Sequence, residues 1–179
     1  MSVISNSIRG LRARLATARG NPLFLAGMVL AVVIILADQA SKFWILKVFD
    51  LPAKGSVEVL PFFSLSMVWN EGVSFGFLAG SGARHVLIVF SIVVAILLSL
   101  WLAEARRRMF AFGLGAVIGG ALGNVIDRVR YGAVADFLDF SGLYFPWVFN
   151  VADSAITVGA GLILLDSVIG SRERPPRAG

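Results

Sequence analysis

Long apolar stretches separated by short polar segments dominate the pattern of this chain. A helix needs about 20 apolar residues, at a rise of about 1.5 Å each, to cross a hydrocarbon layer of roughly 30 Å. Four stretches meet this requirement: residues 23–45, 86–103, 109–126 and 151–169. The pattern therefore predicts a bundle of four transmembrane helices.

The first of these stretches has one alternative interpretation, which is a cleavable signal peptide. Its apolar core is unbroken from Leu23 to Ala37, which is long for the apolar region of a signal peptide, and no A-x-A-like cleavage site follows it. We therefore expect the segment to remain attached as the first span.

The segment between the first two spans, residues 47–84, has a different pattern. Residues that favour strands occur around Val57 and between Phe62 and Val68, and prolines and a glycine separate these runs. We therefore predict an integral membrane protein of the all-α class, in which four transmembrane helices carry a small extracytoplasmic β-sheet between helices 1 and 2.

Small residues on the third span predict how the helices pack. Gly115, Gly119 and Gly123 recur at every fourth position, and Ala155 and Gly159 repeat this spacing on the fourth span. A face of small residues allows a neighbouring helix to approach closely. We expect close helix contacts along both faces.

Composition supports a membrane protein. The chain is 58% hydrophobic and 15% charged, with a mean hydropathy of +0.84. A soluble domain of this length would need more polar residues to cover its surface. We therefore expect lipid to surround the bundle.

The distribution of basic residues predicts the orientation. Ten of the 16 lysines and arginines lie in residues 1–20, in the triplet at 106–108 and after residue 170. Four spans place these three segments on one side, and the positive-inside rule makes that side cytoplasmic. The basic segments then face anionic lipid, and no motif suggests a nucleic-acid partner.

This orientation divides the chain into three parts. Residues 1–21 form a basic cytoplasmic tail, residues 22–170 form the membrane domain with its β region at about 47–84, and residues 171–179 form a second cytoplasmic tail. Apolar residues recur at helical spacing in the first tail, which favours an amphipathic helix at the headgroups. A frayed basic tail is the alternative.

The side chains available for chemistry are few in kind. The chain has no cysteine and only one histidine, His85. Disulfides and thiol catalysis are thereby excluded and a zinc centre is disfavoured, so we expect no metal and no cofactor. Catalysis would depend on carboxylates, hydroxyls, lysine or arginine.

Acidic residues gather at the predicted outer face, where an ionisable group next to hydrocarbon is a functional candidate. Asp38 lies four residues before Lys42, which predicts an ion pair on one helix face in a supporting role. Asp127 is expected to pair with Arg128 or with a neighbouring span. We expect Asp139 to be solvated and Asp166 to lie at the inner interface of the membrane.

Asp136 and Asp153 remain as the candidates for chemistry. If tertiary packing brings them together, the two carboxylates cannot both ionise cheaply, so one can hold a proton while the other activates water. A different interpretation applies to Asp153. It lies three residues after Asn150 at the start of a helix, as in a capping box.

The segment WNEGVSFG, residues 69–76, predicts a tight loop. Gly72 permits backbone angles that other residues resist, and Asn70 could direct its amide at a partner. An ordinary turn is the alternative.

Five short blocks carry a family resemblance. They are DQASK at 38–42, NEGVSFG at 70–76, GNVIDR at 123–128, VADF at 134–137 and FNVADS at 149–154. Each block alone is weakly specific, but the ordered set resembles bacterial lipoprotein signal peptidase, also called signal peptidase II.

The resemblance implies an aspartic endopeptidase that removes the signal peptide from diacylglyceryl-modified prolipoproteins by cleaving before the lipidated cysteine. It implies that Asp136 and Asp153 are the catalytic residues. The implied substrate-binding residues are Asn70, Gly72, Asn124, Arg128 and Asn150, and the implied supporting residues are Asp38 and Lys42. The implied location is the bacterial cytoplasmic (inner) membrane, with the active site at its outer face.

Two other functions use the same acids. In a small transporter or proton-coupled channel they would form a relay, but no internal repeat is visible and the acids gather at one face. In a purely structural scaffold they would only hold the helices together.

Overall fold

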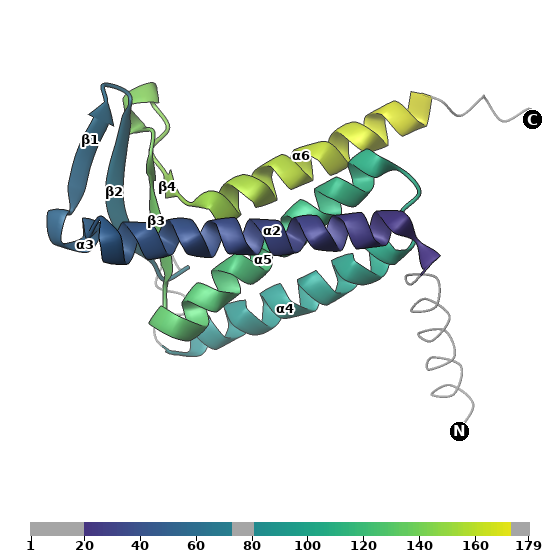
Figure 1. The fold of residues 1–179 in the computed structure, drawn as a ribbon, viewed down its shortest axis with the longest axis horizontal. Coiled ribbons are helices and arrows are strands. Elements are labelled where there is room, and N and C mark those ends of the chain that lie inside the picture. Colours follow the sequence, from purple (N-terminus) through teal and green to yellow (C-terminus); the bar gives the residue numbers. More distant parts are fainter. Residues whose placement is uncertain (1–19, 73–80, 173–179) are drawn as a thin grey trace, which may run out of the picture.

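The computed structural model describes residues 20–72 and 81–172. The expected tails at 1–21 and 171–179, and the NEGVSFG block after Gly72, therefore lie largely outside the described residues. The described part consists of long helices that carry a small sheet at one end (Figure 1).

Among the described residues, four helices are long and apolar enough to cross a membrane, as the pattern predicted. They are α2 (Pro22–Phe43), α4 (Ser81–Ala103), α5 (Arg108–Tyr131) and α6 (Val151–Arg172). Helix α5 is the most buried and packs against the other three. It extends beyond the predicted end at residue 126, so Asp127 and Arg128 lie within the helix.

The expected stripe of small residues brings α5 against α2. A side chain at Gly115 would collide with the backbone of Gly27, and one at Gly119 would lie 2.7 Å from the carbonyl oxygen of Ala31. A second stripe faces α6, where Gly113 approaches Gly159. The glycines thus permit backbone contact on two sides of the central helix.

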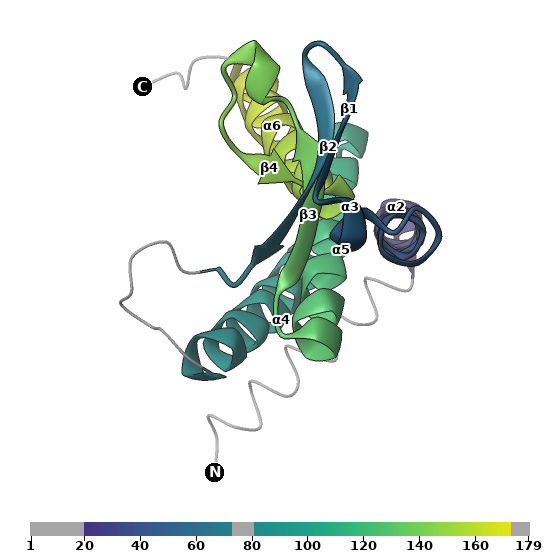
Figure 2. The same cartoon turned by 90° about the vertical axis from the view of Figure 1, so that its left-hand side faces the viewer.

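The sheet differs from the prediction. Strands β1 (Ser56–Leu60) and β2 (Phe63–Asn70) lie between the first two spans, but β3 (Val134–Asp139) and β4 (Val148–Phe149) lie between α5 and α6. All four pair antiparallel in the order β1-β2-β3-β4 (Figure 2). Placing the whole sheet between helices 1 and 2 was wrong, because β3 follows α5 and pairs with β2, a strand distant in sequence. The term all-α is incomplete, because the described residues include this sheet.

A short π-helical segment, η1 (Trp44–Val48), continues α2 toward the sheet and leads into α3 (Leu51–Lys54). Its residues Ile45 and Leu46 form one apolar cluster with Ala135 and Phe137 of β3. Strand β3 therefore packs on an apolar surface at the end of α2. A final short turn, η2 (Ser141–Leu143), links β3 to β4.

We predict that Gly120→Ala destabilises the bundle. A Cβ at this position would collide with the carbonyl oxygen of Ala152 and lie 2.7 Å from Ile156 of α6. Overpacking of this kind raises the free energy of the folded state by about 1–3 kcal/mol. The thermal unfolding midpoint of the purified protein in detergent should fall accordingly.

Gly161→Ala is the matched control, because a Cβ there has nothing within 4 Å. It should be neutral or slightly stabilising, since alanine is favoured over glycine in a helix by about 1 kcal/mol. Equal midpoints for the two variants would show that close approach of α5 and α6 does not limit stability.

Candidate active site

Asp136 lies on β3 with its side chain almost fully buried, at 1% exposure. Two amides donate to its carboxylate: Asn70 Nδ2 to Oδ2 at 2.9 Å and Asn150 Nδ2 to Oδ1 at 2.7 Å. Asn70 is in reach because β2 pairs with β3, with Val68 opposite Asp136. Two donors from separate segments therefore fix one buried carboxylate.

Asp153 lies in the first turn of α6 and is half-buried. Its Oδ2 accepts the backbone N–H of Asn150 at 3.2 Å, and Asn150 Oδ1 accepts the backbone N–H of Asp153 at 2.9 Å. This reciprocal pair confirms the capping-box interpretation. Asn124 Nδ2 also donates to Asp153 Oδ1 at 2.8 Å, so the cap faces the same polar cluster as Asp136.

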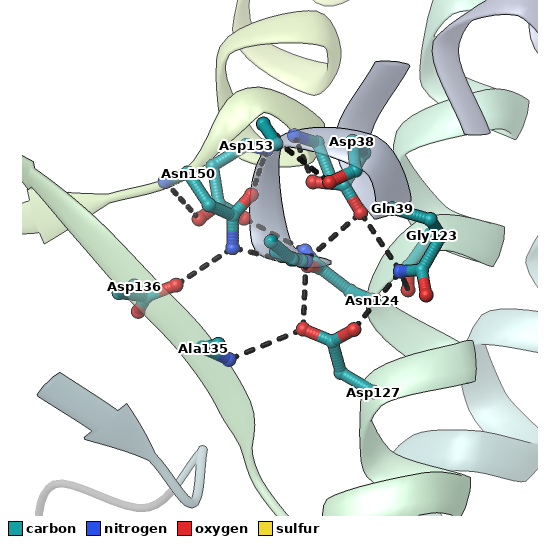
Figure 3. Close-up of polar contacts among 12 residues, drawn as sticks. Asp38, Gln39, Gly123, Asn124, Asp127, Ala135, Asp136, Asn150 and Asp153 are labelled. Atoms are coloured by element: carbon teal, nitrogen blue, oxygen red, sulfur yellow. Dashed lines mark hydrogen bonds and ion pairs between the residues drawn. The ribbon is translucent and has the colours of Figure 1, made fainter. Parts of the chain in front are cut away.

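Asn150 joins the two acids (Figure 3). It is fully buried, its side chain donates to Asp136, and its backbone N–H donates to Asp153. Its Nδ2 also lies 3.2 Å from the Oδ1 of Asn124. The structure thus brings together two aspartates from separate segments, and neutral amides contact both carboxylates.

The environment of Asp136 changes its acidity. Burial raises the pKa of Asp136 to about 6, and the nearby charge of Asp153 acts in the same direction. The hydrogen bonds from Asn70 and Asn150 oppose this shift. Close carboxylates in a buried site favour a state in which one of them retains a proton.

A buried ion cluster lies next to Asp136 and Asp153 and is linked to them through Asn124. Lys42 Nζ is 2.9 Å from Asp38 Oδ2 and 2.7 Å from Asp127 Oδ2, and it donates to Asn124 Oδ1 at 3.2 Å. The ion pair predicted between Asp38 and Lys42 is confirmed. Asp127 pairs with a neighbouring span, which was one of its two expected arrangements.

The two acids of this cluster hold the backbone next to the candidate pair. Asp38 Oδ1 accepts the N–H of Ala152 at 3.0 Å, and Asp127 Oδ2 accepts the N–H of Ala135 at 3.1 Å. Ala152 directly precedes Asp153, and Ala135 directly precedes Asp136. The acids of the cluster therefore contact the chain at the residue before each candidate aspartate.

Sequence reasoning missed two members of this arrangement. Gln39 Nε2 donates to Asp127 Oδ1 at 2.9 Å and lies 3.2 Å from Asp38 Oδ2. Asp127 was expected to form an ion pair with Arg128 or with a neighbouring span, but it was given no role in the site. Its spacing of three residues from Asn124 places both side chains on one face of α5, and this signal could have identified it.

Gly72 lies at the edge of the site, beside Asn70 and Arg128. Gly72 has a φ of +82°, and its N–H donates to Asn70 Oδ1 at 2.8 Å. A Cβ at Gly72 would lie 3.5 Å from the Nη2 atom of Arg128. The Nε atom of Arg128 is buried and has no hydrogen-bond partner among the described residues, so this guanidinium retains donor capacity near the acids.

The other acids lie apart from the pair. Asp139 accepts hydrogen bonds from Ser66 Oγ at 2.7 Å and from the Ser141 N–H at 2.9 Å, and these bonds lower its pKa. It is therefore more than a solvated side chain. Asp166 is buried near the opposite end of the bundle, with Arg107 Nε 3.3 Å away. Within residues 20–72 and 81–172, no group of three acidic, histidine or cysteine side chains could hold a metal ion.

Comparisons with known proteins identify relatives of this chain. The chain is 49% identical over 147 residues to the lipoprotein signal peptidase of Caulobacter vibrioides, with 81% of this chain and 88% of the relative covered. It is 42% identical over 151 residues to that of Rhodopseudomonas palustris strain ATCC BAA-98 / CGA009, with 80% and 92% covered.

Two solved structures share the fold. A bacterial membrane enzyme determined by the in meso method at 2.3 Å resolution superposes with a TM-score of 0.72 at 28% identity, over 86% of this chain and 94% of that chain. A second, at 1.9 Å resolution, gives a TM-score of 0.68 at 31% identity, over 79% and 92%. The family described as signal peptidase (SPase) II matches residues 30–169. The chain therefore belongs to the signal peptidase II family.

Proposed function

We propose that the protein is an aspartic endopeptidase that removes the signal peptide from diacylglyceryl-modified prolipoproteins by cleaving before the lipidated cysteine. One observation carries the proposal: Asp136 and Asp153, from separate segments, both bind Asn150, and neither forms an ion pair among the described residues. Family membership supports the removal of lipoprotein signal peptides.

In this proposal the reactive form of the pair carries one proton, and that proton is on Asp136, because burial raises the pKa of Asp136 to about 6. Asp153 is more exposed and takes a proton from water, which attacks the scissile carbonyl carbon. Asp136 donates its proton to the carbonyl oxygen, which gives a tetrahedral diol. Asp153 then protonates the leaving nitrogen, the C–N bond breaks, and Asp136 recovers a proton from the diol.

Five further residues are proposed to bind the substrate: Asn70, Gly72, Asn124, Arg128 and Asn150. Asn70, Asn124 and Asn150 already contact the acids, and each amide combines donor and acceptor atoms that suit an extended peptide. Arg128 has an unused buried Nε donor beside Gly72. A peptide carbonyl could accept from this donor.

The proposed location follows from the ends of the bundle. The loop before α5, whose sequence contains Arg106 and Arg107, lies at the same end of the bundle as the start of α2 and the end of α6, and the sheet lies at the other end (Figure 1). Asp136 belongs to strand β3 of this sheet. Under the positive-inside rule the arginine end is cytoplasmic. The active site would then lie at the outer face of the bacterial inner membrane, where the signal helix of a substrate can stay in lipid.

Asp38 and Lys42 are proposed to support the site, together with Asp127. Lys42 holds both carboxylates, and each carboxylate holds a backbone N–H beside a candidate catalytic aspartate. The cluster would position Asp136 and Asp153 without touching the substrate.

We predict that Asp136→Asn and Asp153→Asn each lower the turnover of a synthetic diacylated prolipoprotein peptide by roughly a thousandfold, which is the range expected for losing a general acid or base. Both variants should keep the circular dichroism spectrum of the wild type. Asp139→Asn on the same strand is the matched control and should remain active. Near wild-type turnover in either dyad variant would contradict the assignment.

The protonation of Asp136 can be measured directly. Because its pKa is raised to about 6, the side chain should be a neutral acid at pH 5 and ionised at pH 8. Infrared difference spectra should show a carboxylic-acid carbonyl band that disappears with a midpoint near pH 6 and is missing in Asp136→Asn. Persistence of the band in that variant would assign the proton to another residue.

Lys42→Met tests the supporting cluster. Removing the cation leaves two buried carboxylates without their ion pair, which should destabilise the fold by about 3–5 kcal/mol and lower kcat. Lys54→Met is the control, because Lys54 is exposed and donates only to the carbonyl of Phe49 in the described structure. An unchanged kcat in folded Lys42→Met would show that the cluster does not position the pair.

A further inference from the structure

Gln39 lies on α2 beside the buried ion cluster that is formed by Asp38, Lys42 and Asp127 (Figure 3). None of the three charged residues is more than 2% exposed, whereas Gln39 is half-buried. Its side chain therefore covers one side of the cluster and separates it from the surroundings of the bundle.

The face of α2 that carries Gln39 is otherwise apolar and exposed. Leu36 and Phe43, three residues before it and four residues after it, share this face and are 64% and 61% exposed. In a membrane this face would contact lipid, where leucine is favoured and a polar side chain is costly. The local surroundings on α2 thus favour an apolar residue at position 39, and only the contact with the cluster gives the glutamine a favourable role.

The Gln39 amide acts as a donor toward the cluster. Its Nε2 atom lies 2.9 Å from Asp127 Oδ1, 3.2 Å from Asp38 Oδ2 and 3.3 Å from the carbonyl oxygen of Gly123. All three of these atoms are acceptors, and two belong to carboxylates. The reverse orientation would place the amide oxygen against them, so the N–H groups must face the cluster.

The orientation of Asp127 depends on this amide. The Oδ2 atom of Asp127 lies 2.7 Å from Lys42 Nζ and accepts the N–H of Ala135 at 3.1 Å. Its Oδ1 atom has Gln39 as the one donor within the part of the chain that the structure describes. Without that donor, the Oδ1 atom would be buried and unpaired, which favours rotation of the carboxylate away from β3.

We propose that Gln39 is a positioning residue whose amide holds the Asp127 carboxylate in the orientation that supports strand β3 beside Asp136. This inference rests on the peptidase function proposed above. Lys42 neutralises one of the two carboxylates that it contacts, so the cluster keeps a net negative charge. A neutral amide stabilises that charge without adding another.

Gln39→Leu tests the role of the amide. We expect kcat for a diacylated prolipoprotein peptide to fall about tenfold with KM unchanged, because a hydrogen bond to a charged group is lost while the substrate contacts remain. Ser41→Ala is the matched control, since the Ser41 hydroxyl donates to the backbone carbonyl of Asp38 and not to the cluster. An unchanged kcat in Gln39→Leu, or an equal loss in Ser41→Ala, would overturn the proposal.

Gln39→Glu distinguishes positioning from packing. The charged groups that face position 39 are Asp38 and Lys42 on α2 and Asp127 on α5, and Asp136 on β3 and Asp153 on α6 lie beyond the asparagines. A third carboxylate beside one ammonium favours uptake of a proton, and the neutral acid can donate to Asp127 in place of the amide.

The activity of Gln39→Glu relative to wild type at the same pH should therefore depend on pH. We expect a ratio near one at about pH 5 and a ratio about tenfold lower at about pH 8, where the ionised glutamate repels Asp127. Gln39→Leu should show the same loss at both pH values. A ratio for Gln39→Glu that does not change with pH would contradict the positioning role.

Infrared difference spectra give a readout that needs no peptidase activity. Gln39→Glu should add a carboxylic-acid carbonyl band at about pH 5 that persists when Asp136→Asn is combined with it. Absence of this band would overturn the proposal. If the wild type cleaves the peptide and the Gln39 variants match it, only the role of Gln39 fails. If the wild type does not cleave but the band is present, the peptidase function fails and the contact of residue 39 with the cluster stands.

Discussion

The site depends on one ammonium group shared by two buried carboxylates. Lys42 lies between Asp38 and Asp127, and none of the three is more than 2% exposed. Desolvating an ion costs several kcal/mol, so such a cluster persists only where further hydrogen bonds satisfy its atoms. Gln39 and the N–H groups of Ala135 and Ala152 provide those bonds. Moving α2 or α5 would break the ion pair of Lys42 with Asp127, and moving β3 or α6 would break a hydrogen bond to a buried carboxylate, so the cluster fixes these four elements relative to one another.

The direct contacts of the candidate catalytic pair come from neutral side chains. Lys42 is committed to the supporting acids, so Asp136 and Asp153 are contacted by asparagines, which carry no charge. A direct ion pair would stabilise the ionised carboxylate and lower its pKa. With neutral donors, burial dominates and the pKa of Asp136 rises to about 6. The arrangement thus combines a fixed ion cluster with a carboxyl group that can keep its proton.

The local parts of this structure could be predicted from the sequence, and the long-range parts could not. The four spans follow from hydrophobic length, the ion pair of Asp38 with Lys42 from helical spacing, and the cap at Asn150 from local pattern. Strand β3 was missed because it is short and forms by pairing with β2, whose Asn70 is 66 residues from Asp136. The family resemblance indicated the two aspartates, but their contact through Asn150 depends on tertiary packing.

Helix packing and the geometry of the site depend on the same glycines in this bundle. A Cβ at Gly123 would lie 2.8 Å from the Asp38 carboxylate, and one at Gly120 would collide with the carbonyl of Ala152. The missing side chains therefore leave room for the Asp38 carboxylate and for the first turn of α6. Because Asp38 Oδ1 must reach the Ala152 N–H at 3.0 Å, a wider gap between α5 and its neighbours would break the contact that orients Asp153. The glycines that allow the helices to pack closely therefore also allow the ion cluster to form its contacts with α6.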